Sequence, residues 1–364
     1  MVRHLARRQA GAPDFPAVTI MTASPTPRQM VKALVRGEPP SRPLLLPIIF
    51  SLGARMENLP LRTFQGNPTK IANALRQVRN VLRVDGLTCY YDPCLEVEAL
   101  GCQRDWRDDG SSSIAAPSFS SVSDLRAKLN PPDGLAGRGH IATASDVLRR
   151  LKVMLKDEPA SMIRVSGPFT LAAQLLGTGA QTLSQQSPPR ELVEFAAEVS
   201  ASVSKTFVEA GADVILLTEN SLCELTTETA DWYASLLSPI ANVIRFYEAL
   251  PVLFVAGAPV SERNLQQLQK GKHDCTLCWT LSLADFAEDS RRHLQEGISG
   301  IALPAQIFYA AQSGSKDLPS QFLSDSRIAF LTSSGDLTES TDLKHLTRAL
   351  NTLRNNLGHA APSR

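Results

Sequence analysis

The stretch that decides the fold is Gly86-Leu-Thr-Cys-Tyr-Tyr-Asp92, which Pro93 follows directly. Its threonine and aromatic residues are typical of a β-strand. Proline lacks the backbone N–H that a central strand needs, so the strand ends at Asp92. A carboxylate at this end of a strand holds a catalytic position when parallel strands close into a barrel. The fold prediction therefore depends on whether the rest of the chain supplies such strands.

Other segments have the composition of strands that are buried on both faces. Arg42–Phe50, for example, is a continuous apolar run punctuated by prolines. The eight predicted strands are Arg42–Phe50, Gly86–Tyr91, Met162–Ser166, Asp213–Thr218, Val252–Ala256, Cys275–Trp279, Gly300–Leu303 and Ile328–Leu331.

Most of these strands are followed by a segment with helical apolar spacing and recognisable start and stop residues. The predicted helices are Pro27–Gly37, Asn67–Val84, Thr143–Asp157, Pro189–Gly211, Asp231–Leu250, Ser261–Gly271, Ser282–Gly297 and Leu343–Leu357. Repeated right-handed βα units predict an α/β fold of the (β/α)8 TIM-barrel type, with a doubly wound open sheet as the alternative.

The predicted barrel is a single domain over residues 28–360. Residues 1–27 carry three arginines but lack the apolar core of a secretion signal. Their proline, alanine and threonine content favours a disordered tail. A weak transit-like segment and a wrong start site are the alternatives.

The composition narrows the class of protein. The 37 basic and 36 acidic residues leave a net charge of +1, which predicts neither nucleic-acid nor membrane-surface binding. The six scattered cysteines indicate a reducing compartment. Because no apolar run reaches ~18 residues, no transmembrane helix is predicted. These features predict a cytoplasmic protein with a small-molecule partner, and they leave a homodimer open.

Three motifs together resemble the uroporphyrinogen decarboxylase superfamily. They are Gly167–Gly177 (GPFTLAAQLLG), Asp92 with Val97–Gly101 (VEALG), and Phe207–Ile215 (FVEAGADVI). The similarity runs from about Pro27 to Leu357. The resemblance implies a (β/α)8 barrel. Members of the superfamily include the haem-pathway decarboxylase and zinc-dependent methyltransferases that act on corrinoid proteins and thiols.

The resemblance also implies roles for individual residues. Asp92 matches the decarboxylase's catalytic aspartate, whose charge stabilises a protonated pyrrole as CO2 leaves. Arg55 matches the second arginine of a loop that binds substrate carboxylates, and Ser51 stands at the position of the first. A turn aspartate and a solvated loop arginine are the alternative interpretations.

Three further positions depart from the decarboxylase pattern but stay polar. Gln174 stands where the family has a pocket tyrosine, Asn220 near a pocket serine, and Ser334 where a histidine occurs. Glu219 ends a predicted strand, so it is a further candidate for the ligand-binding face. These four side chains are predicted to contact the substrate.

The zinc ligands of the methyltransferases have no counterparts here. The matching positions hold Phe254, Ala256 and Gly335, none of which has a donor side chain. His273 and Cys275 share one face of a predicted strand, but two ligands do not make a zinc site. No metal and no cofactor are therefore predicted.

The leading functional hypothesis is a cofactor-independent lyase that resembles uroporphyrinogen decarboxylase and acts on a carboxylated tetrapyrrole or related ligand. Such an activity belongs to porphyrin and haem biosynthesis. The second hypothesis is a divergent corrinoid-linked methyltransferase without the usual zinc ligands. The third is a catalytically silent barrel that binds a tetrapyrrole or a corrinoid.

Overall fold

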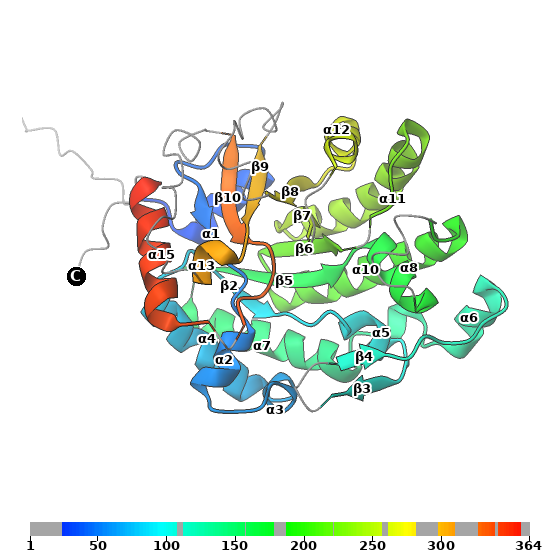
Figure 1. Cartoon of the computed structure of the whole chain (residues 1–364), viewed down its shortest axis with the longest axis horizontal. Coiled ribbons are helices and arrows are strands. Elements are labelled where there is room, and N and C mark those ends of the chain that lie inside the picture. Colours follow the sequence, from blue (N-terminus) through cyan, green and yellow to red (C-terminus); the bar gives the residue numbers. More distant parts are fainter. Residues whose placement is uncertain are drawn as a thin grey trace, which may run out of the picture.

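The computed structural model shows eight parallel strands that curl into a nearly closed barrel with helices around it (Figure 1). This confirms the predicted TIM-barrel class. The structure describes residues 24–107, 112–156, 158–177, 187–220, 222–256, 261–281, 298–309, 327–338 and 341–357.

Neighbouring barrel strands follow one another in chain order, apart from a small hairpin inserted after the second. The barrel strands are β1 (Leu44–Leu45), β2 (Gly86–Tyr90), β5 (Ala160–Ser166), β6 (Val214–Glu219), β7 (Leu250–Val255), β8 (Thr276–Thr280), β9 (Ser299–Leu303) and β10 (Ile328–Ser333).

The seam of the barrel lies between β1 and β2. The N–H of Asp85, just before β2, donates to the carbonyl of Leu45 over 3.0 Å, which brings the two strands together. On its other side β1 pairs with β10. Because all the strands are parallel, their carboxyl ends share one end of the barrel, called the mouth below.

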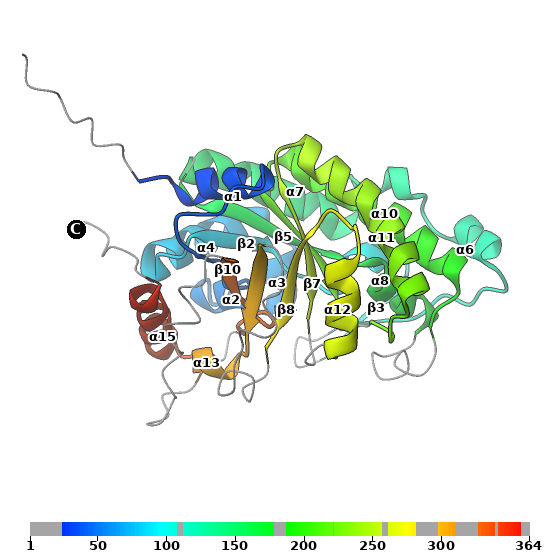
Figure 2. The ribbon, with the colours of Figure 1, turned by 90° about the horizontal axis from the view of Figure 1, so that it is seen from above.

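The helices pack around the barrel, and α10 and α11 lie side by side on one flank (Figure 2). The helices are α1 (Pro27–Val35), α2 (Ser51–Met56), α3 (Leu61–Gln65), α4 (Pro68–Leu82), α5 (Leu95–Ala99), α6 (Val122–Lys128), α7 (Gly139–Leu155), α8 (Pro168–Leu176), α10 (Arg190–Ala210), α11 (Thr227–Phe246), α12 (Glu262–Lys270), α13 (Gln306–Tyr309) and α15 (Leu343–Asn356), with one 3-10 turn at Pro132–Gly134.

The core has two parts, separated by the barrel wall. Alternate strand residues such as Met162, Leu216 and Phe254 pack inside the barrel, and their neighbours, such as Ile163, pack against the helices. Helix α1 contributes apolar residues to the interior part, where they meet the starts of the strands. The end opposite the mouth is therefore covered.

All eight predicted strands are present, with shifts at their ends. The ladder of β1 covers only Leu44–Leu45 because prolines flank it. Helix α11 begins at Thr227, where the Thr226 side chain caps it, and ends before β7 starts at Leu250. The predicted end of this helix at Leu250 was therefore wrong. The predicted helix Ser282–Gly297 and most of the predicted tail lie outside the described residues.

The prediction missed several short elements at the mouth. Helices α2, α5 and α8 each start within six residues of a strand end. The excursion after α5 contains an antiparallel hairpin of β3 (Arg104–Trp106) and β4 (Ser112–Ile114). Among the described residues, no helix combines the length and apolarity needed to cross a membrane.

Candidate active site

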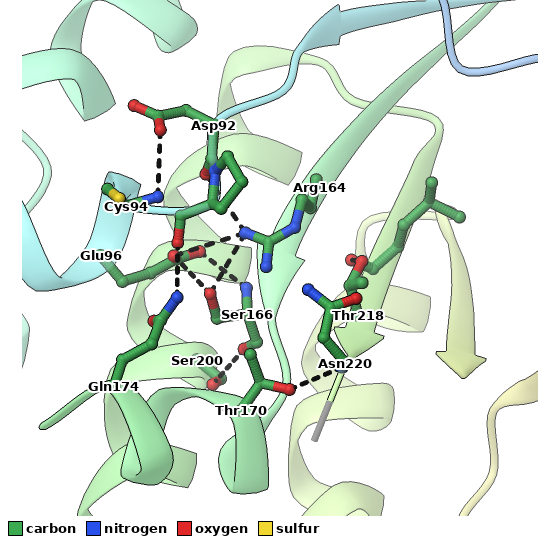
Figure 3. Close-up of polar contacts among 12 residues, drawn as sticks. Asp92, Cys94, Glu96, Arg164, Ser166, Thr170, Gln174, Ser200, Thr218 and Asn220 are labelled. Carbon is green, nitrogen blue, oxygen red and sulfur yellow. Dashed lines mark hydrogen bonds and ion pairs between the residues drawn. The ribbon is translucent and has the colours of Figure 1, made fainter. Parts of the chain in front are cut away.

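Asp92 lies at the mouth directly after β2, as predicted, but its side chain turns toward the surrounding helices (Figure 3). It is 2% exposed. Arg104 on β3 donates from both terminal nitrogens to its two carboxylate oxygens, over 2.6 and 3.1 Å. The N–H of Cys94 donates to Oδ1 over 3.0 Å. Asp92 is therefore one half of a buried, bidentate ion pair.

A second carboxylate extends this ion pair into a four-residue cluster, which we call the Asp92 cluster. Arg104 also donates to Glu98 on α5 over 2.9 Å, and the ring of His140 on α7 lies 2.7 Å from the same Glu98 oxygen. Burial raises the pKa of Glu98, but hydrogen bonds with His140 and Arg104 outweigh it, so its pKa lies below the usual value. The Asp92 cluster thus sets two carboxylates against one guanidinium, with the His140 ring beside Glu98.

The spacing of Asp92, Glu98 and His140 would also suit a metal ion. The guanidinium of Arg104 contacts both carboxylates, however, and thereby supplies the positive charge that a metal would bring. The Arg104 guanidinium also lies 4.0 Å from the centre of the Trp106 ring. We therefore interpret the group as an internal charge cluster and not as a metal site.

A second buried charge group lies beside the first. Arg164 on β5 donates to the backbone carbonyl of Asp92 over 3.2 Å and lies 3.9 Å from a Glu96 oxygen. Glu96 accepts from the N–H and the hydroxyl of Ser166, each over 2.7 Å. Figure 3 shows Asp92 and Arg164 side by side, with the Asp92 carboxylate pointing away from the guanidinium.

Glu219, a predicted substrate contact, is fully buried at the end of β6. Its carboxylate accepts from the N–H of Phe169, from the N–H and hydroxyl of Thr170, and from the hydroxyl of Tyr233. These contacts fix the first turn of α8, whose N–H groups have no partner within the helix. Burial raises the pKa of Glu219. Contact between Glu219 and a substrate stays a prediction.

Asn220 and Gln174 lie nearer the mouth. Asn220 is exposed, its backbone N–H donates to Thr170, and its side-chain amide points toward Arg164 in Figure 3. The Gln174 amide donates to the Pro93 carbonyl over 2.8 Å, and its own oxygen is buried without a partner among the described residues. Both side chains retain polar atoms for a ligand.

Ser51 and Ser334 lie where β1 and β10 end. The N–H and hydroxyl of Ser51 both donate to the Asp336 carboxylate, and the Phe50 N–H donates to it over 2.7 Å. The half-buried Ser334 donates its backbone N–H to Leu303 over 2.8 Å. The Asp336 carboxylate thus holds the start of α2 against the end of β10, and it engages the hydroxyl of Ser51 as a hydrogen-bond donor.

Asp336 is expected to make stability depend on pH. Burial raises its pKa from 3.8 to about 6, although hydrogen bonds from Ser51 and Phe50 act in the opposite direction. The folded protein therefore holds this proton more tightly than the unfolded chain, so stability falls as pH rises from about 4 to about 6, by on the order of 2 kcal/mol. Burial also raises the pKa of other carboxyls, among them Glu96 and Glu219. Urea unfolding should therefore compare wild type with Asp336→Asn between pH 4 and pH 6. The free energy of unfolding should fall less steeply with pH in Asp336→Asn than in wild type. An equally steep fall in both proteins would contradict the raised pKa of Asp336.

Arg55, the predicted carboxylate anchor, is exposed on α2. Its Nη1 donates to the carbonyl of Thr341 over 3.0 Å. With Asn58, Leu59 and Pro60 it lines an open surface depression of about 410 Å³. A role of Arg55 in binding substrate carboxylates stays a prediction.

The positions that match the methyltransferase zinc ligands do not suit a metal. The Phe254 ring fills part of the barrel interior, Ala256 is buried after β7, and Gly335 has no side chain. His273 precedes β8 at the covered end, where its ring contacts the Leu268 carbonyl and the Cys275 N–H. Neither group can hold zinc in the manner of the methyltransferases.

Sequence reasoning missed Arg104, Glu98, His140 and Arg164. Arg104 and His140 lie in segments without a clear pattern, so nothing local indicated that they would meet Asp92. Arg164 did leave a signal, because it is a lone charged residue in an otherwise apolar strand.

The family model and the superposition on a methyltransferase agree with this architecture. The family model described as "Uroporphyrinogen decarboxylase (URO-D)" matches residues 26–295. A methyltransferase from Methanosarcina mazei superposes with a TM-score of 0.70 at 16% identity, over 91% of this chain and 98% of that one. A B12-independent methionine synthase from Shewanella sp. W3-18-1 gives a TM-score of 0.49 at 12% identity, over 81% and 88%. The search of curated proteins finds no match.

The fold and the polar mouth define a (β/α)8 barrel of the kind that carries its ligand site at the carboxyl ends of the strands. Since the family model covers most of the chain, this protein belongs to the uroporphyrinogen decarboxylase family.

Proposed function

We propose that this protein is a cytoplasmic, cofactor-independent lyase of the uroporphyrinogen decarboxylase type, and that it acts on a carboxylated tetrapyrrole or a related ligand at the mouth. In such a reaction the substrate ring is protonated, and the bond to a carboxylate group breaks. The electron pair of that bond returns to the ring as CO2 leaves, and a proton takes the place of CO2. The protein must therefore stabilise a transient positive charge.

The observation that supports this proposal is the pair of carboxylates, Asp92 and Glu98, that the Asp92 cluster places at the mouth. Two carboxylates face a single guanidinium there, and Asp92 and Arg104 are almost fully excluded from water. Electrostatic stabilisation is strongest in such a fixed, water-poor environment. Arg104 would orient the Asp92 carboxylate, and Glu98 would offset the opposing charge of Arg104.

One observation favours a second function, a barrel that binds such a ligand without turnover. Both oxygens of Asp92 accept hydrogen bonds from Arg104, so the charge of Asp92 is largely neutralised by its own partner. In this alternative the Asp92 cluster only joins the hairpin to the barrel.

Turnover of porphyrinogens separates the two functions. Purified protein is incubated without oxygen with porphyrinogens that carry acetate and propionate side chains, and the products are followed by mass spectrometry. The lyase proposal expects time-dependent loss of CO2 from at least one of them. Binding of these porphyrinogens without any loss of CO2 would contradict it and favour the silent barrel.

A further inference from the structure

Arg164 is the largest fully buried side chain among the described residues, at 1% exposure. Its neighbours on β5 alternate in the expected way: Met162 packs inside the barrel, while Ile163 and Val165 pack toward the helices. Arg164 follows Met162 by two residues and therefore faces the barrel interior. A charge at this place requires a partner.

Among the described residues, one nitrogen of this guanidinium has hydrogen-bond partners, and the guanidinium carbon lies 5.8 Å from the centre of the Tyr91 ring. Nη1 donates to the Asp92 carbonyl and to the Ser166 hydroxyl, each over 3.2 Å. Nε and Nη2 have no hydrogen-bond partner in the part of the chain that the structure describes. These two nitrogens form one edge of the planar group, and their N–H bonds point the same way. A carboxylate binds to such an edge through two parallel hydrogen bonds.

No protein carboxylate takes up this edge among the described residues. Among the described residues, Glu96 is the one carboxylate within ion-pair distance; it lies 3.9 Å from Arg164 and already accepts two hydrogen bonds of 2.7 Å from Ser166. Leaving charged donors buried and unpaired costs on the order of 1–3 kcal/mol or more. The described part of the chain therefore leaves this edge without a hydrogen-bond partner, and the unpaired edge suggests a ligand.

The surrounding interior is suited to an organic anion. Thr280 and Thr332 occupy interior positions on β8 and β10, and their buried hydroxyls also lack partners among the described residues. Phe254 and Ala302 contribute apolar interior surface. An interior that holds unpaired hydroxyl and guanidinium donors as well as apolar side chains suits a carboxylate that is attached to an apolar body.

We propose that the Nε/Nη2 edge of Arg164 binds a carboxylate group of an organic ligand inside the mouth of the barrel. This site differs from the surface position of Arg55. It requires no turnover, so it holds whether the protein is a lyase or a silent barrel.

Benzoate tests the site, with the isosteric but uncharged benzamide and with inorganic phosphate as the other probes. Isothermal titration calorimetry should show saturable binding of benzoate and at least about tenfold weaker binding of benzamide and phosphate, because only a carboxylate offers the planar oxygen pair. Equal binding of benzoate and benzamide would overturn the proposal, and so would tighter binding of phosphate.

Arg164→Lys keeps the positive charge but removes the two-donor edge, so benzoate should bind at least about tenfold more weakly. Arg354→Lys is the matched control. Arg354 is a buried arginine whose donors are engaged with Asn351 and with the carbonyls of Leu82 and Arg83, so this variant should bind benzoate as wild type does. Unchanged binding in folded Arg164→Lys would overturn the proposal.

If Arg164→Lys does not fold, a crystal structure of wild type with 4-bromobenzoate tests the same site without the variant. The anomalous signal of bromine should place the ligand carboxylate on the Nε/Nη2 edge, and a position elsewhere contradicts the site. If wild type binds benzoate but turns over no porphyrinogen, the result counts against the lyase proposal alone. If wild type turns over a porphyrinogen but does not bind benzoate, the result counts against the Arg164 site alone.

Discussion

Under the lyase proposal, Asp92→Asn is expected to lower turnover by about 10²–10³-fold, because it deletes one fixed charge that would stabilise the developing positive charge. The variant should also lose stability, since it leaves Arg104 with a single carboxylate partner, Glu98. Breaking a buried ion pair costs about 3–5 kcal/mol, so the melting temperature should fall by several degrees. Steady-state assays and thermal unfolding measure the two effects.

Asp85→Asn is the matched control, because Asp85 lies at the other end of the same strand. Its carboxylate forms a bidentate ion pair with Arg42, over 2.8 and 2.9 Å, and accepts the N–H of Leu45. This variant should lower the melting temperature without changing turnover. Equal losses of turnover in Asp85→Asn and Asp92→Asn would show that stability alone explains the effect.

The variant Arg104→Gln distinguishes the effect of the Asp92 charge on turnover from the effect of the Asp92–Arg104 ion pair on stability. This variant removes the cation and leaves both carboxylates in place. Under the lyase proposal it should lose stability as Asp92→Asn does, yet retain at least about ten times more turnover, since the stabilising charge is still present. If Arg104→Gln and Asp92→Asn lose turnover equally, the charge of Asp92 has no role separate from the ion pair.

Glu219→Ala is expected to lower the free energy of unfolding by about 3–4 kcal/mol. The change removes a fully buried carboxylate and leaves the start of α8 and the hydroxyls of Thr170 and Tyr233 without their acceptor. Tyr233→Phe removes one of these hydrogen bonds and should cost only about 1 kcal/mol. Urea unfolding measures both values.

A double-mutant cycle with Gly167→Ala adds a geometric test of Glu219. A Cβ at Gly167 would overlap the Glu219 carboxylate, so Gly167→Ala should destabilise wild type strongly. In the Glu219→Ala background the overlap disappears, and the same change should cost much less. Additive effects, or a Glu219→Ala variant as stable as wild type, would contradict the assigned role.

The barrel itself could be predicted from the sequence because its strands are marked locally. Apolar runs such as Val252–Ala256 end in proline, glycine or a polar residue, and the strand pattern repeats along the chain with helices between. Helix α5 was missed because five residues contain too few turns for a helical period to be visible. Helix α8 was missed because it is buried on nearly every side, so no alternation of apolar and polar faces marks it.

The sequence by itself also determined that Asp92 lies at the mouth, since Pro93 ends the strand there whatever the surroundings. Only the tertiary structure decided what the carboxylate contacts. Side chains alternate across a strand, so a shift of one residue would have turned Asp92 toward the barrel axis instead of toward Arg104. Arg104, Glu98 and His140 meet Asp92 because a hairpin and two helices pack at this place. Such ionic contacts depend on distances between segments that no local pattern encodes.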